Sequence, residues 1–382
     1  MTLARAGTAV LLIVSCTAAC GQGLLGGDGD DDKGDILIGM DIPLTGDSAE
    51  IGPYMKNGAQ LAIDEINARG GVLGGRKLKL RTEDDACDPK LAVAAASKLV
   101  SAGITMSVGG YCSTATLPTL PVFDKAKIPL ITIANSAQIY QQGLKHVFLI
   151  NGTGDQQAAA GLTWLAKDGA RRVAVMHDNT SYSRDIAERA VAELDEPGGP
   201  DKATLEVVTP KETDFAAAVT SVLRTRPDYV FWTGYYAEGG LLIRQFRAAG
   251  YKGRFLVGDG SVATGLVKIA GGANAEGVYA TMCPTPGTIP GASGWIARYR
   301  KSFGAEPGPY STQAYDGIRL AAEALGKAGS TDGGALVAAL ERINGFPMFS
   351  GPLRFTPQHT ISGGFEIQVV RGGRFVLQDR LR

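Results

Sequence analysis

The residue types that most often do chemistry are scarce in this chain of 382 residues. It contains three histidines and five cysteines, and His146, His177 and His359 are not spaced as metal ligands. The sequence also lacks the G-x-S-x-G, H-E-x-x-H and Walker A motifs of common hydrolases and nucleotide-binding enzymes. We therefore expect no catalytic residues, no metal site and no cofactor. His177 ends a predicted strand, and we expect it to have a structural or hydrogen-bonding role.

The polar residues that remain gather in loops that follow predicted strands. Ligands bind at the carboxyl ends of the strands in open parallel sheets, so these loops are the candidates for a binding site. They are rich in Gly, Ser, Thr, Asn and Tyr and contain few groups able to act as a general base. This composition predicts a cleft that binds by hydrogen bonds. The loops are residues 43–51, 109–114, 134–137, 177–182, 234–238 and 258–261.

The elements that must position these loops alternate between strands and helices. This alternation predicts βαβ units and mostly parallel sheets, and its two successive series predict two doubly wound α/β lobes with a break near residues 151–155. Expected strands cover residues 36–42, 78–82, 104–108, 130–134, 172–177, 205–209, 229–233, 255–258, 365–370 and 374–378. Expected helices cover residues 52–69, 89–101, 117–125, 183–194, 215–223, 239–249, 295–303, 315–327 and 334–342.

The composition is that of an ordinary globular protein, with 45% hydrophobic and 20% charged residues. Lys plus Arg number 38 and Asp plus Glu number 38, so the formal net charge is zero. Because a nucleic-acid-binding protein should show a basic excess, we expect no nucleic-acid partner.

The N-terminus reads as a targeting segment rather than as part of the fold. Residues 1–20 combine Arg5, a short apolar run and small residues, which is the pattern of a secretory signal. The segment ends in small residues and Cys20, which resembles a bacterial lipobox, so we expect acylation of Cys20 and anchoring to the outer face of the cytoplasmic membrane. Cys16 is a competing cleavage site, and a plain signal peptide is the alternative. The Gly- and Asp-rich residues 21–34 are expected to be a flexible tether, and no later stretch predicts a transmembrane helix.

Five segments resemble the bacterial leucine/isoleucine/valine-binding proteins in sequence, order and spacing. They are residues 84–90 (DDACDPK), 110–114 (GYCST), 177–182 (HDNTSY), 234–238 (GYYAE) and 258–260 (GDG). The resemblance extends from about residue 36 to the C-terminus. It implies a type I periplasmic-binding fold, in which two Rossmann-like lobes joined by three hinge strands close over a small solute. It also implies a function as the solute-binding component of an ATP-driven importer.

This resemblance implies lobe boundaries and partners. The N-terminal lobe would comprise residues 35–154 and 285–358, and the C-terminal lobe residues 155–284 and 359–382. The expected ligand is a branched-chain amino acid or a related small amino-acid-like solute. The expected protein partners are the membrane permease and ATPase subunits of an ABC importer, and we expect the chain itself to be a monomer.

The resemblance also implies a disulfide and a ligand site. Cys87 and Cys112 match a conserved disulfide pair, while Cys283 has no expected role beyond that of a buried thiol. Ser113 matches a serine that holds the ligand carboxylate, and Asp259 replaces a glutamate that pairs with the ligand ammonium. Ser136 keeps the hydroxyl of a ligand-binding threonine, Asn135 replaces a small apolar residue, and the tyrosines match aromatic residues of the cleft. The complete expected set is Tyr111, Ser113, Thr114, Asn135, Ser136, Tyr182, Tyr235, Tyr236 and Asp259.

Other interpretations of these residues and of the whole chain remain open. Ser113 can be a simple helix cap, Asp259 can fix a turn, and the tyrosines can be packing residues. A ligand-sensing receptor subunit of the same fold, for an amide or an aromatic acid, is one alternative function. An exported α/β enzyme with Asp259 or Glu238 as general base is another, although the sequence offers no nucleophile–base set to support it.

Overall fold

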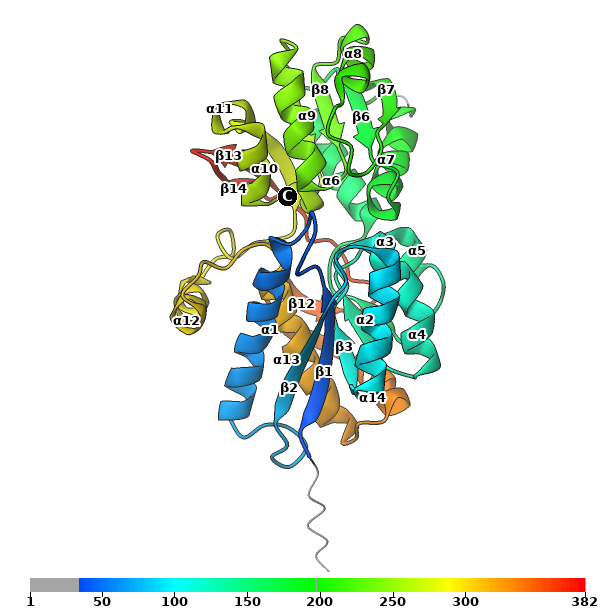
Figure 1. Ribbon diagram of the computed structural model, residues 1–382, viewed down its shortest axis with the longest axis vertical. Helices are drawn as coiled ribbons and strands as arrows, with labels where there is room; N and C mark the ends of the chain where they lie inside the picture. Colours follow the sequence, from blue (N-terminus) through cyan, green and yellow to red (C-terminus); the bar gives the residue numbers. More distant parts are fainter. Residues whose placement is uncertain (1–33, 197, 382) are drawn as a thin grey trace, which may run out of the picture. The chain divides into compact units, whose positions relative to one another are not determined.

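The computed structural model describes residues 34–196 and 198–381. The predicted signal sequence with Cys16 and Cys20, and nearly all of the predicted tether, therefore lie outside the described residues. The described chain forms two mainly parallel sheets, each with helices on both faces (Figure 1). The expected doubly wound α/β class is confirmed.

Five parallel strands form the first sheet in the order β2-β1-β3-β4-β5. Both faces of this sheet are covered, so its central strands are almost entirely buried. In β1, Ile38 and Met40 belong to the core on one face, whereas Gly39 lets Ile104 pack closely on the other, where a Cβ would lie 2.5 Å from its side chain. The strands are β1 (Ile36–Ile42), β2 (Leu78–Asp84), β3 (Met106–Val108), β4 (Leu130–Thr132) and β5 (Val147–Leu149).

The helices of the first sheet divide between its two faces. Helices α1 and α13 pack against each other, and α2 and α4 cover the opposite face (Figure 1). Asp88 starts α2, because its carboxylate accepts hydrogen bonds from the Lys90 and Leu91 amides at 2.8 and 3.0 Å. The helical segments are α1 (Ile51–Ala68), α2 (Pro89–Ser101), α3 (Ser113–Thr116), η1 (Leu117–Thr119), α4 (Leu120–Lys125), α5 (Ala137–Tyr140) and α13 (Ser311–Ala328).

Seven strands form the second sheet in the order β14-β13-β10-β9-β8-β6-β7. The strands from β10 to β7 are parallel, and β13 and β14 add an antiparallel edge. Alternate residues face opposite cores, with Phe231 in one and Trp232 in the other. The strands are β6 (Arg172–His177), β7 (Asp201–Val207), β8 (Tyr229–Trp232), β9 (Arg254–Val257), β10 (Tyr279–Met282), β13 (Glu366–Arg371) and β14 (Arg374–Asp379).

Helices α6 and α7 cover one face of the second sheet, and α8, α9 and α10 belong to the other. The segments of this part are α6 (Gly154–Lys167), α7 (Ser181–Leu194), α8 (Ala216–Arg224), α9 (Tyr236–Ala248), η2 (Asp259–Ser261), α10 (Thr264–Ala270) and α11 (Gly272–Ala275). The remaining elements are α12 (Ser293–Phe303), α14 (Gly333–Glu341) and a hairpin of β11 (Asn344–Met348) and β12 (Gly351–Arg354).

Several elements differ from the sequence-based expectation, and the short elements α3, α5, α10, α11, β5, β11 and β12 were not expected. Helix α6 was not expected, although Thr153 and Gln156 form a capping box at its start. Strand β7 begins at Asp201 rather than at residue 205, because this edge strand pairs with β6 from its first residue while showing little apolar character there. Strand β10 was also missed, and it is held between β9 and β13.

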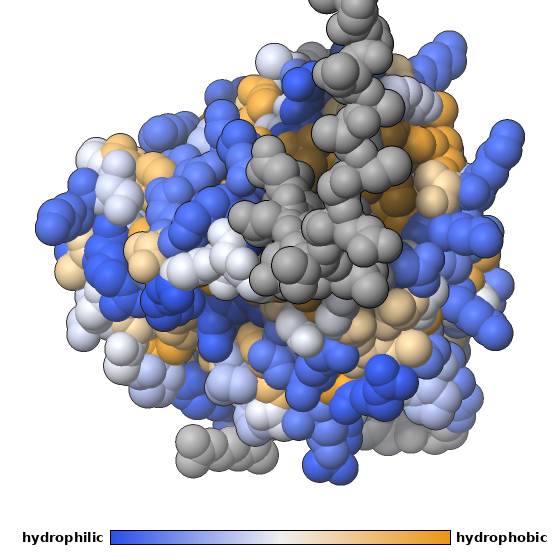
Figure 2. Space-filling view, turned by 90° about the horizontal axis from the view of Figure 1, so that it is seen from below, coloured by the Kyte–Doolittle hydropathy of each residue, from blue (hydrophilic) through white to orange (hydrophobic). Residues whose placement is uncertain are grey.

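None of the helices within residues 34–381 is long and apolar enough to cross a membrane. The face seen in Figure 2 carries mostly hydrophilic residues, with hydrophobic ones in smaller patches between them.

Candidate functional site

A small cavity of about 10 Å³ lies where loops from both sheets meet. Its lining comes from the segments that follow strands β3, β4, β8 and β9, from the first turn of α7 and from the residue before α13. The carboxyl ends of parallel strands are the usual place for a ligand in such folds. The lining residues are Tyr111, Ile133, Asn135, Tyr182, Tyr235, Asp259, Gly260 and Tyr310.

Asp259 is the only charged residue among those that line the cavity, and it is 3% exposed. Tyr182 Oη donates a 2.6 Å hydrogen bond to its Oδ1, and Asn151 Nδ2 donates to its Oδ2 at 3.4 Å. Burial raises the pKa of the Asp259 carboxyl, and hydrogen bonds from neutral groups oppose that shift only in part. A buried carboxylate whose donors are all neutral is a natural partner for a cationic group of a ligand.

The glycines beside Asp259 let the tyrosines close over it. A Cβ on Gly260 would lie 2.9 Å from the Tyr235 ring and 3.0 Å from the Tyr182 ring, and one on Gly258 would lie 2.7 Å from Tyr182 Oη. Any side chain at either position would therefore push the rings away from the carboxylate. The segment 258–260, which the sequence singled out, thus has a steric reason for both of its glycines.

Four tyrosine rings surround the cavity and contact one another. The Tyr111 ring centroid lies 5.9 Å from that of Tyr235 and 5.3 Å from that of Tyr310, and Tyr182 lies 4.9 Å from Tyr235. Burial raises the pKa of all four phenols well above the ordinary value, so they are neutral hydrogen-bonding groups at physiological pH. The Tyr235 hydroxyl accepts a hydrogen bond from the Ser113 amide, whereas the Tyr111 hydroxyl has no hydrogen-bond partner among the described residues.

The first-sheet residues of the site form a connected polar layer. Ser113 is fully buried, and its Oγ accepts a hydrogen bond from the Ser136 amide at 3.2 Å. Asn135 Nδ2 donates to Gln157 Oε1 at 3.2 Å, and Gln157 Nε2 in turn donates to Thr281 Oγ1 at 3.1 Å. This layer links the loop after β4 to α6 and β10.

Two of the expected ligand residues use their hydroxyls to join elements of the two sheets. Ser136 Oγ donates to the Asp185 carboxylate on α7 and also caps α5. Thr114 Oγ1 lies 2.9 Å from Ser181 Oγ and accepts the Ser181 amide at 3.0 Å. Neither residue is part of the cavity lining.

A third link between the sheets involves Glu50. Its carboxylate accepts hydrogen bonds from the Thr264 amide at 2.8 Å, the Thr264 hydroxyl at 2.7 Å and the Gly265 amide at 2.8 Å. These amides start α10, so the carboxylate caps a helix of the other sheet. Tyr236 packs against Gly265 at this link and lies outside the cavity lining, whereas Tyr235 lies within it.

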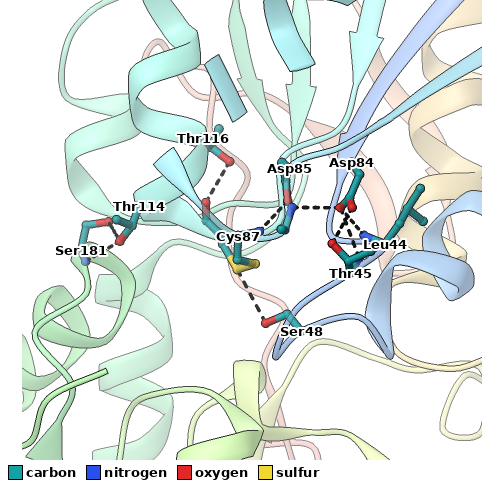
Figure 3. The surroundings of a disulfide bond; sticks show 11 residues. Leu44, Thr45, Ser48, Asp84, Asp85, Cys87, Thr114, Thr116 and Ser181 are labelled. Atoms are coloured by element: carbon teal, nitrogen blue, oxygen red, sulfur yellow. Dashed lines mark hydrogen bonds between the residues drawn. A yellow bond between two sulfur atoms is a disulfide. The ribbon is translucent and has the colours of Figure 1, made fainter. Parts of the chain in front are cut away.

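A disulfide joins Cys87 and Cys112, as the resemblance implied (Figure 3). It connects the loop after β2 to the residue just before Ser113. Cys87 has a positive φ of 53°, and its amide donates to Asp85 Oδ1 at 2.8 Å, which fixes the turn. The bridge therefore holds the backbone that presents Ser113. Cys283 is a buried free cysteine, and its sulfur accepts a hydrogen bond from the Gln313 side chain.

The structure therefore brings together Tyr111, Asn135, Tyr182, Tyr235 and Asp259 around the cavity. Ser113 lies outside the lining, where it contacts Tyr235 and Ser136. Sequence reasoning missed Tyr310, Asn151 and Gln157. The capping box at Thr153–Gln156 was a signal that could have identified α6 and hence Gln157. Tyr310 gave no such signal, because its place beside Asp259 depends on a chain crossing from far along the sequence.

The histidines lie away from this cavity. His177 Nδ1 accepts a hydrogen bond from the Asn179 amide at 3.1 Å, and burial lowers the pKa of its ring. His359 stacks on Phe148 with ring centroids 4.2 Å apart. Within residues 34–381, no group of three or more His, Cys, Asp or Glu side chains is placed to hold a metal.

Two sheets whose strand ends face one small cavity are the architecture of a solute-binding protein of the periplasmic-binding class. The comparisons with known proteins agree: residues 35–374 match the periplasmic binding protein family model, and the chain belongs to this family. Its relatives include an amino acid binding protein of Pseudomonas aeruginosa, which is 35% identical over 302 residues, covering 78% of this chain and 80% of that protein. They also include Leu/Ile/Val-binding protein homolog 1 of Brucella suis, which is 33% identical over 326 residues, covering 84% and 86%.

Solved structures show the same fold. The branched-chain amino acid transporter substrate binding protein LivJ of Streptococcus pneumoniae, in complex with isoleucine, matches with a TM-score of 0.82 and 25% identity, covering 90% of this chain and all of that one. Members of this family are extracytoplasmic substrate-binding proteins and not enzymes.

Proposed function

We propose that this chain is the lipid-anchored substrate-binding protein of an ABC importer for a branched-chain amino acid or a related small amino-acid-like solute. The observation that carries the proposal is the buried carboxylate of Asp259, which faces a small enclosed cavity and receives hydrogen bonds only from neutral groups. An amino acid supplies the missing cation, because its ammonium group can pair with that carboxylate. The names of the relatives support the same class of ligand.

The proposed binding site divides the ligand between two lobes. Ser113, Asn135 and their neighbours are assigned to the ligand carboxylate, while Asp259 and the tyrosines Tyr182 and Tyr235 close over the ammonium end. Thr114 and Ser136 are assigned to the rim of the site, where they contact α7. The ligand would act by favouring the closed member of an open–closed equilibrium.

The proposed lobes comprise residues 35–154 with 285–358 and residues 155–284 with 359–382. Strand membership supports this division, because the first sheet uses only strands between Ile36 and Leu149 and the second only strands between Arg172 and Asp379.

A ligand screen tests the proposed substrate class. The purified chain without its signal segment should show a higher melting temperature with one or more amino acids, because a ligand that binds only the folded state stabilises it. Calorimetry should then give one ligand per chain. A lack of binding across amino acids, amides and aromatic acids would contradict the substrate class.

Lipid anchoring can be tested separately in cells. Labelling with a radioactive fatty acid should mark the wild-type protein and the Cys16→Ala variant but not the Cys20→Ala variant. Labelling that is lost in Cys16→Ala and kept in Cys20→Ala would instead place the lipid on Cys16.

A further inference from the structure

The lining of the cavity combines aromatic rings with several polar groups. Ile133 is the only lining residue with an aliphatic side chain, and the others are tyrosines, Asn135, Asp259 and a glycine. Small-molecule pockets are normally lined mainly by hydrophobic groups, with a few polar groups for orientation. Here the rings supply apolar faces, but each ring also carries a hydroxyl that must be satisfied.

Three of the four hydroxyls have partners within the protein. Those of Tyr182 and Tyr310 hydrogen-bond to the Asp259 carboxylate, and that of Tyr235 accepts from the Ser113 amide. The Tyr111 hydroxyl is buried and has no partner among the described residues. Tyr111 is 6% exposed, and its ring contacts both Tyr235 and Tyr310, so the hydroxyl is enclosed with the cavity rather than open to bulk water.

We infer that the ligand carries a hydrogen-bonding group on its side chain, a hydroxyl or a carboxamide, which satisfies the Tyr111 hydroxyl. This inference rests on the proposed function and narrows its ligand class away from leucine, isoleucine and valine. A branched aliphatic side chain would leave the Tyr111 hydroxyl buried without a partner, which is unfavourable. A site built to hydrogen-bond its ligand discriminates strongly against an analogue that lacks the polar group.

Threonine and valine are suitable probes for this inference, because they have nearly the same shape and differ by a hydroxyl in place of a methyl group. Asparagine and leucine form a second pair with the same kind of contrast.

The test is calorimetry of the mature chain with these two pairs. We expect threonine to bind at least about tenfold more tightly than valine, or asparagine at least about tenfold more tightly than leucine. Equal or tighter binding of both aliphatic partners would overturn the inference while leaving the proposed function intact. If no amino acid binds at all, the amino-acid part of the proposed function fails, and the Tyr111→Phe measurement below decides the inference with whichever solute the screen identifies.

Tyr111→Phe separates a role in binding from a role in packing. Removing an unpartnered buried hydroxyl should raise the melting temperature of the ligand-free protein and lower the affinity for the polar ligand about tenfold or more. Tyr299→Phe is the control, because the Tyr299 side chain on α12 is also buried but lies outside the cavity lining. The control should leave the affinity unchanged. An unchanged affinity in Tyr111→Phe would contradict the inference.

Discussion

The two sides of the cavity are held in place by different means. On the first-sheet side, the Cys87–Cys112 disulfide ties the loop after β2 to the segment that contains Tyr111 and Ser113. The Asp84 carboxylate binds the Leu44 amide after β1, and the Asp85 carboxylate binds the Cys87 amide (Figure 3). On the second-sheet side, the described residues contain no disulfide, and hydrogen bonds position Tyr182 and Asp259. The first-sheet side is thus fixed by a covalent bond. The second-sheet side carries the Asp259 carboxylate in a network of hydrogen bonds, to which a bound ligand can add a further partner.

Removal of the disulfide should have the largest effect, and it should act on the first-sheet side. Cys87 and Cys112 are separated by 25 residues. Closing a loop of this length in the unfolded chain corresponds to a stabilisation of about 3 kcal/mol. We expect Cys87→Ala with Cys112→Ala to lower the free energy of unfolding by about that amount, as measured by denaturant titration.

The free cysteine gives the control for this prediction. Cys283→Ala removes a buried thiol that is not in a disulfide. The unfolding free energy of this variant should still depend on reducing agent, as in wild type. The unfolding free energy of the variant without Cys87 and Cys112 should not. Peptide mapping without reduction should link Cys87 to Cys112. Free thiols at both positions would contradict the pairing.

A change of charge on the second-sheet side should affect binding more than folding. Asp259→Asn keeps the shape but removes the proposed partner of the ligand ammonium, so the binding free energy should fall by at least about 2 kcal/mol. Asp316→Asn is the matched control, since Asp316 is also buried but pairs with Arg319, away from the cavity. Unchanged affinity in Asp259→Asn, or an equal loss in Asp316→Asn, would argue against the proposed ammonium site.

In the ligand-free protein, Asp259→Asn should increase the stability of the folded state. Burial raises the pKa of Asp259 in the folded state above its unfolded value, so the folded protein releases this proton at higher pH than the unfolded chain. Stability is therefore lost as the pH rises through that interval. Melting curves should show Asp259→Asn to be more stable than wild type at neutral pH, and this gain should disappear at a pH below the ordinary range of an aspartate.

The first-sheet side also has a buried acid with a pH effect of this kind. Burial and repulsion from Asp85 raise the pKa of Asp41 to about 7, and its Oδ2 has no hydrogen-bond partner among the described residues. Stability should fall as the pH rises from about 4, where the unfolded carboxyl ionises, toward 7. Asp41→Asn should remove this dependence and raise the free energy of unfolding at pH 8, as measured by denaturant titration.

Asp84 provides a contrast for that measurement. Although burial acts in the opposite direction, hydrogen bonds from Thr45, Leu44 and Ala86 lower its pKa. Asp84→Asn should therefore cost stability at neutral pH, and the cost should shrink as the pH falls below the ordinary aspartate range. If both variants changed the pH dependence of stability in the same direction, the opposite pKa shifts assigned to Asp41 and Asp84 would be wrong.

Much of the fold was predictable because it depends on local patterns. Buried strands such as β1 are continuous apolar runs, and Asp88 and Pro89 mark the start of α2. The site was predictable where its residues follow strands, as Tyr111, Asn135 and Asp259 do.

The remaining features depend on contacts between distant parts of the chain. Ser136 was expected to use its hydroxyl for the ligand, but Asp185, which lies 49 residues away, accepts that hydroxyl's hydrogen bond. Tyr310 reaches the cavity from the chain segment that precedes α13, with a left-handed φ of 62° that no local motif predicted. Such contacts follow from the packing of whole elements, so no periodicity or spacing in the sequence indicates them.

The link formed by Glu50 gives the smallest expected effect, and it tests how the two sides of the cavity are coupled. The Glu50 carboxylate lies on the first-sheet side and accepts three hydrogen bonds from the start of α10 on the second-sheet side. Glu50→Gln keeps one acceptor and removes the charge, so it should weaken the closed arrangement by about 1 kcal/mol, with ligand dissociation faster by several-fold. Stopped-flow dissociation should show this change with little effect on the melting temperature of the ligand-free protein.

Asp64→Asn is the control, because Asp64 is an exposed acid of α1 that bonds to Gln60 on the same helix. Dissociation rates that are equal in Glu50→Gln, Asp64→Asn and wild type would mean that this link does not contribute to closure. The coupling between the fixed and the charged side would then depend on the ligand and on the contacts of Thr114 and Ser136 alone.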